Sequence, residues 1–109
     1  MLFKRSDADH KTYSGACSVR EYNLPSEDFS FATAVINGCF PENGRVSNTK
    51  CDEIYFVISG SAVIHSDKGD FEICEGDVYF FKKGEKYWVE GSNLSLALVN
   101  TPKWFPEQH

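Results

Sequence analysis

DEIYFVISG, the stretch Asp52–Gly60, decides the fold. After an acidic pair it runs through five consecutive apolar residues, 54–58, and ends at a Ser-Gly pair. The run is rich in β-branched and aromatic residues and too short for a globular helix, so it predicts a β-strand that ends in a turn. Because side chains alternate across a strand, Glu53 shares one face with Tyr55. Both faces of this strand are therefore apolar, and one of them carries a carboxylate.

Length and composition indicate one folded domain. The chain has 109 residues, which is enough for a single hydrophobic core and too few for two. Apolar residues make up 41% of it and aromatic residues 15%, and this excludes a disordered chain. We expect one domain over 1–109, with residues 1–15 as an N-terminal arm or edge strand and residues 101–109 as a C-terminal tail.

The charge of the chain disfavours polyanionic partners. The formal net charge is −5, from 16 acidic and 11 basic residues, and the main basic cluster is Lys82, Lys83 and Lys86 around Gly84. Binding to a nucleic acid or an anionic membrane depends on a basic surface, so we expect neither partner. The three lysines are better explained by a solvated turn.

Two further features concern the cellular compartment. The N-terminal residues 1–10 lack the apolar segment of a signal peptide, and no apolar run approaches the length of a membrane span, so we expect a cytoplasmic protein. The cysteines at positions 17, 39, 51 and 74 have no close pairing. This spacing favours reduced thiols packed in a core over disulfides or a zinc site.

The rest of the chain predicts an all-β architecture. Turn signals that contain glycine recur roughly every 8–12 residues, and no helical pattern lies between them. Further strands are predicted over residues 19–22, 31–36, 62–65, 71–74, 78–81, 87–89 and 94–100. This spacing of short strands is typical of a β-sandwich or a β-barrel.

Two spaced motifs resemble those of the cupin family. Glu53, six further residues and Gly60 match the end of the first cupin motif, and Gly76, five residues, Lys82-Lys83 and Gly84 match the frame of the second. The last strand, LSLALVN, and the exit TPKWFPE also resemble small single-domain cupins. The resemblance covers almost the whole chain and implies a jelly-roll barrel, the double-stranded β-helix.

When the two motifs are aligned in this way, the usual metal-binding histidines are replaced by other residues. Cupins bind a divalent metal through two His and the Glu of the first motif and one His of the second. Here the paired His positions fall on Ser47 and Thr49, or on Val46 and Asn48 if one more residue precedes the Glu, and the remaining His position is Tyr87. Only Glu53 is kept, and one carboxylate does not hold a transition metal tightly. We therefore expect no cofactor.

A different set of residues offers an alternative metal site. Thr49, Cys51 and Glu53 lie two residues apart, so a continuous strand would place them on one face. Cys51, Glu53 and His65 could then form an atypical metal site. The competing interpretation is that the Cys51 thiol is a small buried apolar group and that His65 lies at a strand end.

Glu53 and Tyr87 are the candidate catalytic residues. A carboxylate inside an apolar barrel has a raised pKa, and Tyr87 could act as its hydrogen-bond partner or as a second proton carrier. The structural alternative is that Glu53 only satisfies a buried network with the hydroxyls of Ser47, Thr49 or Tyr87. Either interpretation predicts that the Glu53 carboxyl has polar partners in the barrel.

The aromatic residues suggest a pocket. Tyr55 and Tyr87, with Tyr79 or Phe80 and with Trp88, could line the barrel mouth or simply fill the barrel. If the barrel is open, the predicted ligand-binding residues are Ser47, Thr49, Glu53, Tyr55 and Tyr87.

Three hypotheses on function follow. The leading one is binding of a small polar organic ligand, a sugar or a carboxylate, without the usual metal. The alternatives are a small enzyme, which would be a metal-independent acid–base isomerase or lyase or an atypical-metal cupin, and a non-catalytic structural or regulatory dimer with a filled barrel. The resemblance and the second apolar face of Asp52–Gly60 also imply a homodimer.

Overall fold

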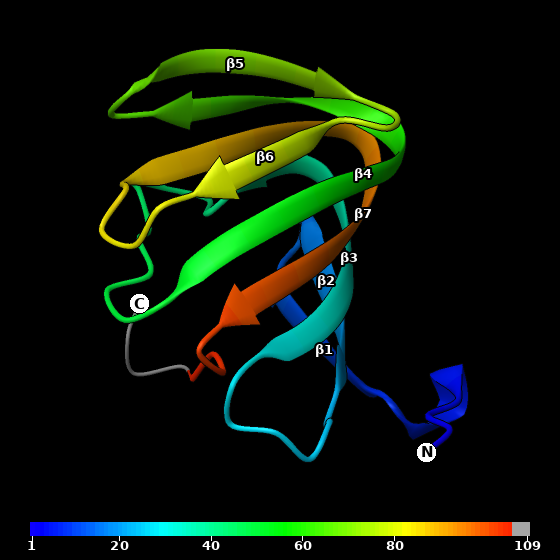
Figure 1. The fold of residues 1–109 in the computed structure, drawn as a ribbon. Helices are drawn as coiled ribbons and strands as arrows, with labels where there is room; N and C mark the ends of the chain where they lie inside the picture. Colours follow the sequence, from blue (N-terminus) through cyan, green and yellow to red (C-terminus); the bar gives the residue numbers. More distant parts are fainter. Residues whose placement is uncertain (106–109) are drawn as a thin grey trace.

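A computed structural model of the chain describes residues 1–105 and shows an almost purely antiparallel β-structure (Figure 1). Its elements are the 3-10 turn η1 (Arg5–Asp7) and the strands β1 (Asp9–Ser14), β2 (Cys17–Tyr22), β3 (Ser30–Phe40), β4 (Asp52–Ser66), β5 (Gly69–Cys74), β6 (Val78–Phe81) and β7 (Tyr87–Thr101). The all-β prediction is confirmed.

The strands form one sheet that folds over on itself. Their order is β1-β2-β3-β7-β4-β5, and β6 pairs with the first half of β4. β7 runs antiparallel to nearly the whole of β4, whereas β5 pairs only with the second half of β4. The two halves of β4 therefore belong to two opposed layers, and Figure 1 shows the long strands curving from one layer into the other.

The prediction of a turn at the end of Asp52–Gly60 is wrong. β4 continues through Gly60 to Ser66 as one bent strand, with register shifts against β7 on both sides of Ser59. Gly60 has φ +80°, and a Cβ atom there would lie 2.1 Å from the Asn93 carbonyl oxygen. The glycine thus permits a close backbone crossing at the corner of the barrel. β7 likewise joins the two strands predicted over 87–89 and 94–100.

The two faces of β4 are as predicted. Glu53, Tyr55 and Val57 are buried inside the barrel, and Phe56 and Ile58 on the opposite face are each 45% exposed. Inside, the core consists mainly of aliphatic side chains from β3, β4 and β7, together with the Phe81 ring of β6. Glu53 is therefore a carboxylate on the apolar inner face.

The ends of the chain and the cysteines complete the fold. β1 is the strand at one edge of the sheet and pairs with β2. All four cysteines are free, but only Cys17 and Cys51 are buried. The expectation that all four pack in the core is wrong for the other two, which are exposed. Of the predicted tail, residues 106–109 lie outside the described residues.

Across residues 1–105, no helix is long and apolar enough to cross a membrane.

Candidate ligand-binding site

The barrel encloses a cavity of about 200 Å³. Strands β1, β2, β3, β4 and β7 and the segment after β7 all contribute to its lining. Small and aliphatic side chains, among them Cys17, Val19, Ala34 and Ile36, form its middle part. Polar side chains lie both at its buried end and at its mouth. The barrel is thus open to a small molecule.

Glu53 lies at the buried end of the cavity. Glu53 is only 6% exposed. Its Oε1 atom accepts hydrogen bonds from Asn48 Nδ2 at 2.9 Å and from the Tyr87 hydroxyl at 3.2 Å. Within residues 1–105, Oε2 accepts no hydrogen bond of good geometry. Both donors therefore act on the same carboxylate oxygen of Glu53.

Burial changes the protonation of this end of the cavity. The loss of hydration raises the pKa of Glu53, and the hydrogen bonds from Asn48 and Tyr87, together with the nearby amide of Asn100, only partly oppose that rise. Burial, followed by the charge of Glu53, also raises the pKa of Tyr55 and of Tyr87 well above the usual value. Both phenols thus stay protonated hydrogen-bond donors, and Glu53 keeps its proton to a higher pH than a solvated Glu.

Asn100 supplies an unused donor beside Glu53. It pairs with Glu53 across β7 and β4, lines the cavity and is 1% exposed. Its amide is close enough to lower the pKa of Glu53, yet its Nδ2 atom makes no hydrogen bond of acceptable length and angle to the described part of the chain. A buried N–H group without a partner costs roughly 1–3 kcal/mol. A ligand acceptor would remove this cost.

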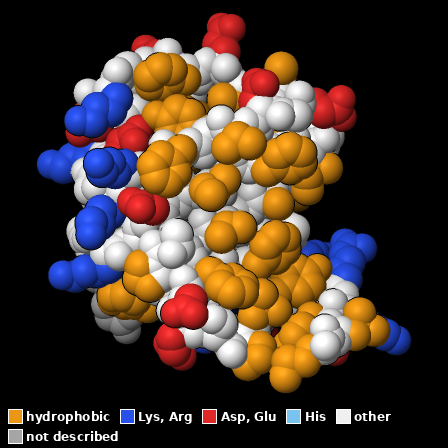
Figure 2. Space-filling view, viewed as in Figure 1, with side chains coloured by type: hydrophobic (Ala, Val, Ile, Leu, Met, Phe, Trp, Pro, Cys, Tyr) orange, Lys and Arg blue, Asp and Glu red, His pale blue; other side chains and the backbone are white. Residues whose placement is uncertain are grey.

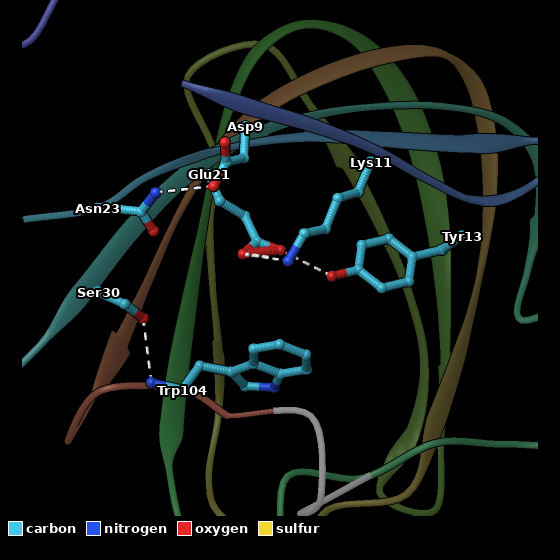
Figure 3. A network of polar contacts seen from close by, with 7 residues as sticks. All are labelled: Asp9, Lys11, Tyr13, Glu21, Asn23, Ser30 and Trp104. Atoms are coloured by element: carbon cyan, nitrogen blue, oxygen red, sulfur yellow. Dashed lines mark hydrogen bonds and ion pairs between the residues drawn. The ribbon is translucent and has the colours of Figure 1, made fainter. Parts of the chain in front are cut away.

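The mouth of the cavity carries a second polar group. Glu21 on β2 accepts a hydrogen bond from the Tyr13 hydroxyl at 2.8 Å and forms an ion pair with Lys11 at 3.3 Å. Figure 3 shows these three side chains and the indole of Trp104 directed toward one space, and all four residues line the cavity. The mouth thus combines hydrogen-bonding groups with two aromatic rings.

The segment after β7 places Trp104 at the mouth. The Cys51 thiol donates a hydrogen bond to the Pro102 carbonyl at 3.2 Å, and the Trp104 backbone N–H donates to Ser30 Oγ, also at 3.2 Å (Figure 3). The indole Nε1 donates to Asn48 Oδ1 at 3.2 Å. Because Asn48 also holds Glu53, the two ends of the cavity share one hydrogen-bonded chain.

Three of the five predicted ligand-binding residues line the cavity, namely Glu53, Tyr55 and Tyr87. Ser47 and Thr49 are not among the lining residues in the described part of the chain, and Asn48 faces Glu53 instead. The segment before β4 is not a strand, so the two-residue spacing did not place Thr49 beside Glu53.

The other aromatic candidates lie away from the cavity. Phe80 is 53% exposed on the outside of the barrel, and Trp88 stacks on the His65 ring with centroids 3.9 Å apart. Tyr79 packs against Phe81, and its hydroxyl donates to Glu85 at 2.5 Å. Strand alternation places Phe80 and Trp88 outside, because their neighbours Phe81 and Tyr87 point inward.

The alternative metal site is not formed. His65 lies at the far end of β4 from Glu53, between Asp70 at 3.0 Å and Glu90 at 3.3 Å, and Cys51 contacts the segment after β7. Among the described residues, no group of three His, Cys, Asp or Glu side chains could hold a metal ion. The corner at Gly60 separates His65 from Glu53, and this bend was not predicted.

The sequence analysis missed Asn100, Trp104 and the group at the mouth. A signal for Asn100 was present, because Leu94, Leu96, Leu98 and Asn100 alternate along one strand and therefore share its inner face. Lys11, Tyr13 and Glu21 gave no such signal, since they come together only when β1 folds onto β2.

Comparison with solved structures finds proteins whose folds match almost the whole chain at low sequence identity. A variant of Streptomyces Pac13 in which a tyrosine is replaced by phenylalanine, in a structure with uridine, superposes with a TM-score of 0.88 at 11% identity, over 99% of this chain and 86% of that one. Pac13 is described as a nucleoside dehydratase. KdgF from Halomonas has a TM-score of 0.79 at 10% identity, over 95% of this chain and 96% of that one.

A third match is the ectoine synthase of P. lautus, with a TM-score of 0.79 at 16% identity over 95% of this chain and 79% of that one. No protein-family model matches the sequence, and neither does any curated protein. The matched structures are cupin-fold proteins, so this chain has the cupin fold, as its two motifs predicted.

Proposed function

We propose that the protein binds a small, uncharged, hydroxyl-bearing organic molecule, such as a sugar or a nucleoside, in its barrel. The observation that carries this proposal is the pair formed by Glu53 and Asn100 at the buried end of the cavity. Asn100 offers a donor without a partner, and Glu53 offers an oxygen that the protein leaves unused.

A hydroxyl group fits this pair. It can accept a hydrogen bond from Asn100 Nδ2 and donate its own proton to Glu53 Oε2 at the same time. The cavity of about 200 Å³ has room for roughly seven water molecules or for one small organic molecule. A single hydroxyl at the buried end would therefore orient a ligand whose remaining atoms fill the apolar middle of the cavity.

A carboxylate ligand fits less well at the buried end. Its negative charge would face Glu53, and two carboxylates in a shared site cannot both be ionised at low cost. Such a ligand would bind only with Glu53 protonated, so its affinity would fall as the pH rises. An uncharged ligand avoids this cost, and we therefore favour a sugar-like compound over a carboxylate.

The mouth suits the outer part of a sugar-like ligand. The rings of Trp104 and Tyr13 offer apolar faces for a sugar or a base, and Lys11 and Glu21 offer polar groups at the rim. The Streptomyces Pac13 structure with uridine supports this proposal, because it shows that a barrel of this fold accepts a nucleoside.

The proposal is tested by calorimetric titration with uridine, D-ribose and D-glucuronate. We expect uridine or D-ribose to bind wild-type protein, and Asn100→Leu to weaken that binding at least ~10-fold because one buried hydrogen bond is lost. Asn43→Leu is the matched control, since Asn43 is exposed and lies outside the cavity lining.

The stability of Asn100→Leu separates a lost ligand contact from a damaged fold. This substitution removes a buried donor that has no partner, so the free energy of unfolding should stay within about 1 kcal/mol of wild type. Equal affinities in Asn100→Leu and Asn43→Leu would contradict the proposed site. Binding of D-glucuronate alone would contradict the proposed uncharged ligand.

A further inference from the structure

Two side-chain hydrogen bonds join the mouth of the cavity to its buried end. The indole Nε1 of Trp104 donates to Asn48 Oδ1 at 3.2 Å, and Asn48 Nδ2 donates to Glu53 Oε1 at 2.9 Å. Asn48 is 2% exposed and Glu53 is 6% exposed, so water competes little for the bond between them. A change at the indole can therefore reach the carboxyl group through a single side chain.

Trp104 sets the orientation of the Asn48 amide. An indole N–H group only donates, so it must face the oxygen of that amide. The NH₂ side of Asn48 then points toward Glu53. In the flipped amide, two N–H groups would meet at Trp104 and an oxygen would face the Glu53 carboxyl group, which would cost both hydrogen bonds. The indole thus selects the orientation in which Glu53 receives a hydrogen bond.

The two hydrogen bonds also strengthen each other. Both point in the same direction, from the indole through the amide to the carboxyl group. An amide that accepts a hydrogen bond at its oxygen is a better donor at its nitrogen, because the two bonds polarise one conjugated group. Loss of the Trp104 N–H group should therefore weaken the bond to Glu53 even if the amide does not flip.

The backbone holds both ends of this chain in place. The Trp104 backbone N–H donates to Ser30 Oγ at 3.2 Å (Figure 3), and the Asn48 carbonyl accepts from the Gly84 N–H at 2.8 Å. The main chain at Trp104 and at Asn48 is thus fixed before any ligand enters. The indole and the amide are preorganised partners.

The indole also lies where a ligand can touch it. Trp104 is half-buried and lines the mouth together with Tyr13 and Glu21 (Figure 3). Hydrophobic and acidic side chains lie next to each other at the lower edge of the molecule in Figure 2, where Figure 1 places the segment after β7. This end of the barrel is therefore a mixed surface, which suits a ligand with polar and apolar parts.

We propose that Trp104 is a positioning residue that couples the mouth of the cavity to Glu53 through the Asn48 amide. A ligand contact with the indole acts on the first member of the chain, and a ligand hydroxyl at Glu53 acts on the last. Because such coupling is reciprocal, each contact changes the strength of the other. The role of a ligand rests on the proposed function, whereas the coupling is a property of the ligand-free protein.

NMR of the ligand-free protein tests the coupling. Trp104→Phe keeps an aromatic ring at the mouth but has no N–H donor. We expect the side-chain carboxyl carbon of Glu53 and both side-chain amide protons of Asn48 to shift in this variant. Trp88→Phe is the matched control, since Trp88 stacks on His65 outside the barrel and its replacement should leave these resonances in place. Unchanged Glu53 and Asn48 resonances in Trp104→Phe would overturn the proposal.

Asn48→Ala separates the hydrogen-bonded route from a direct effect of the ring. The different ring current of phenylalanine acts on Glu53 with or without the amide, but the route through the amide is lost in Asn48→Ala. The shift that Trp104→Phe causes at Glu53 should therefore become smaller in the Asn48→Ala protein. Equal shifts in the two backgrounds would contradict coupling through Asn48.

The reverse direction guards against an Asn48→Ala protein that does not fold. Glu53→Gln keeps the shape of the side chain and removes its charge, so the indole N–H resonance of Trp104 should shift. Glu90→Gln is the matched control, because Glu90 is exposed on β7 beside His65, and it should leave the indole unchanged. An unchanged indole resonance in folded Glu53→Gln would also overturn the proposal.

Titration with uridine and D-ribose separates this inference from the proposed function. Trp104→Phe should bind them roughly 3–10-fold more weakly than wild type and Trp88→Phe equally well, since one hydrogen bond that positions Glu53 is lost. Coupled resonances in a protein that binds neither compound would contradict the proposed function and leave the coupling supported. Ligand binding without coupled resonances would overturn the coupling alone.

Discussion

At the scale of single residues, Glu53 makes the inner face of β4 different from an ordinary apolar core. A carboxylate inside an apolar barrel is kept only if polar groups surround it, and Asn48 and Tyr87 hold one of its oxygens. Burial raises the pKa of Glu53 despite these partners. In the proposed site, a ligand hydroxyl supplies a further polar contact to this carboxyl group.

The pH dependence of stability should report this raised pKa. The folded protein holds the Glu53 proton more tightly than the unfolded chain, so the wild type loses stability as the pH rises above about 4.5 and stops losing it above the folded-state pKa. Glu53→Gln cannot ionise and can still accept both hydrogen bonds at Oε1. Its stability relative to wild type should therefore increase with pH, by about 1.4 kcal/mol for each unit by which the pKa is raised.

Urea unfolding of both proteins, at about pH 4 and about pH 8, measures this difference. Comparing the two proteins at each pH cancels the contributions of the other ionisable groups. A Glu53→Gln variant that becomes less stable than wild type as the pH rises would contradict a raised pKa at Glu53.

The sequence was sufficient to place Glu53 and to identify its aromatic neighbours. Alternation along one strand is a local property, so the inner positions of Glu53, Tyr55 and Val57 followed from the residues alone. Asn48 was not assigned, because the irregular segment before β4 sets its direction and no periodicity governs such a segment. The group of Lys11, Tyr13 and Glu21 depends on pairing between two strands.

At the scale of elements, the bend in β4 makes the closed barrel. The same strand serves two opposed layers, and the bend brings Gly60 against the Asn93 backbone on β7. Any side chain at position 60 would meet that backbone, which cannot move without displacing β7. The corner is thus a position where the fold demands glycine.

Gly60→Ala should lower the free energy of unfolding by about 2–4 kcal/mol, from the positive φ angle together with the backbone clash. Gly76→Ala is the matched control, because Gly76 has a similar φ of +88° but no atom within 4 Å of the new Cβ. It should cost about 1–2 kcal/mol. Equal losses for the two variants in chemical unfolding would mean that the close crossing at Gly60 does not matter.

The sequence did not distinguish this corner from a turn. A serine and a glycine between two apolar runs are typical of a hairpin, and local chemistry is the same in a tight turn and in a bent strand. Only the pairing of β7 along both halves of β4 decides between them. For the same reason, two strands were predicted where β7 is continuous.

At the scale of the whole molecule, the two faces of one sheet meet different surroundings. The inner face of β4 carries Glu53 and Tyr55 toward the cavity, and the opposite face exposes Phe56 and Ile58. The fold was predictable because the spacing of Glu53, Gly60, Gly76 and Gly84 matches two motifs. The open cavity was not, because aromatic residues that fill a barrel and those that line a pocket have the same sequence pattern.

The central claim is that the unused donor of Asn100 binds a ligand hydroxyl inside the barrel. Its most direct test is an NMR titration that follows the side-chain amide protons of Asn100, assigned by comparison with Asn100→Leu, while uridine or D-ribose is added. We expect those two resonances to shift in a saturable manner and to move with the backbone signals of Glu53 and Tyr87. Saturable binding that leaves the Asn100 side-chain resonances unchanged, or no binding of either compound, would contradict the claim.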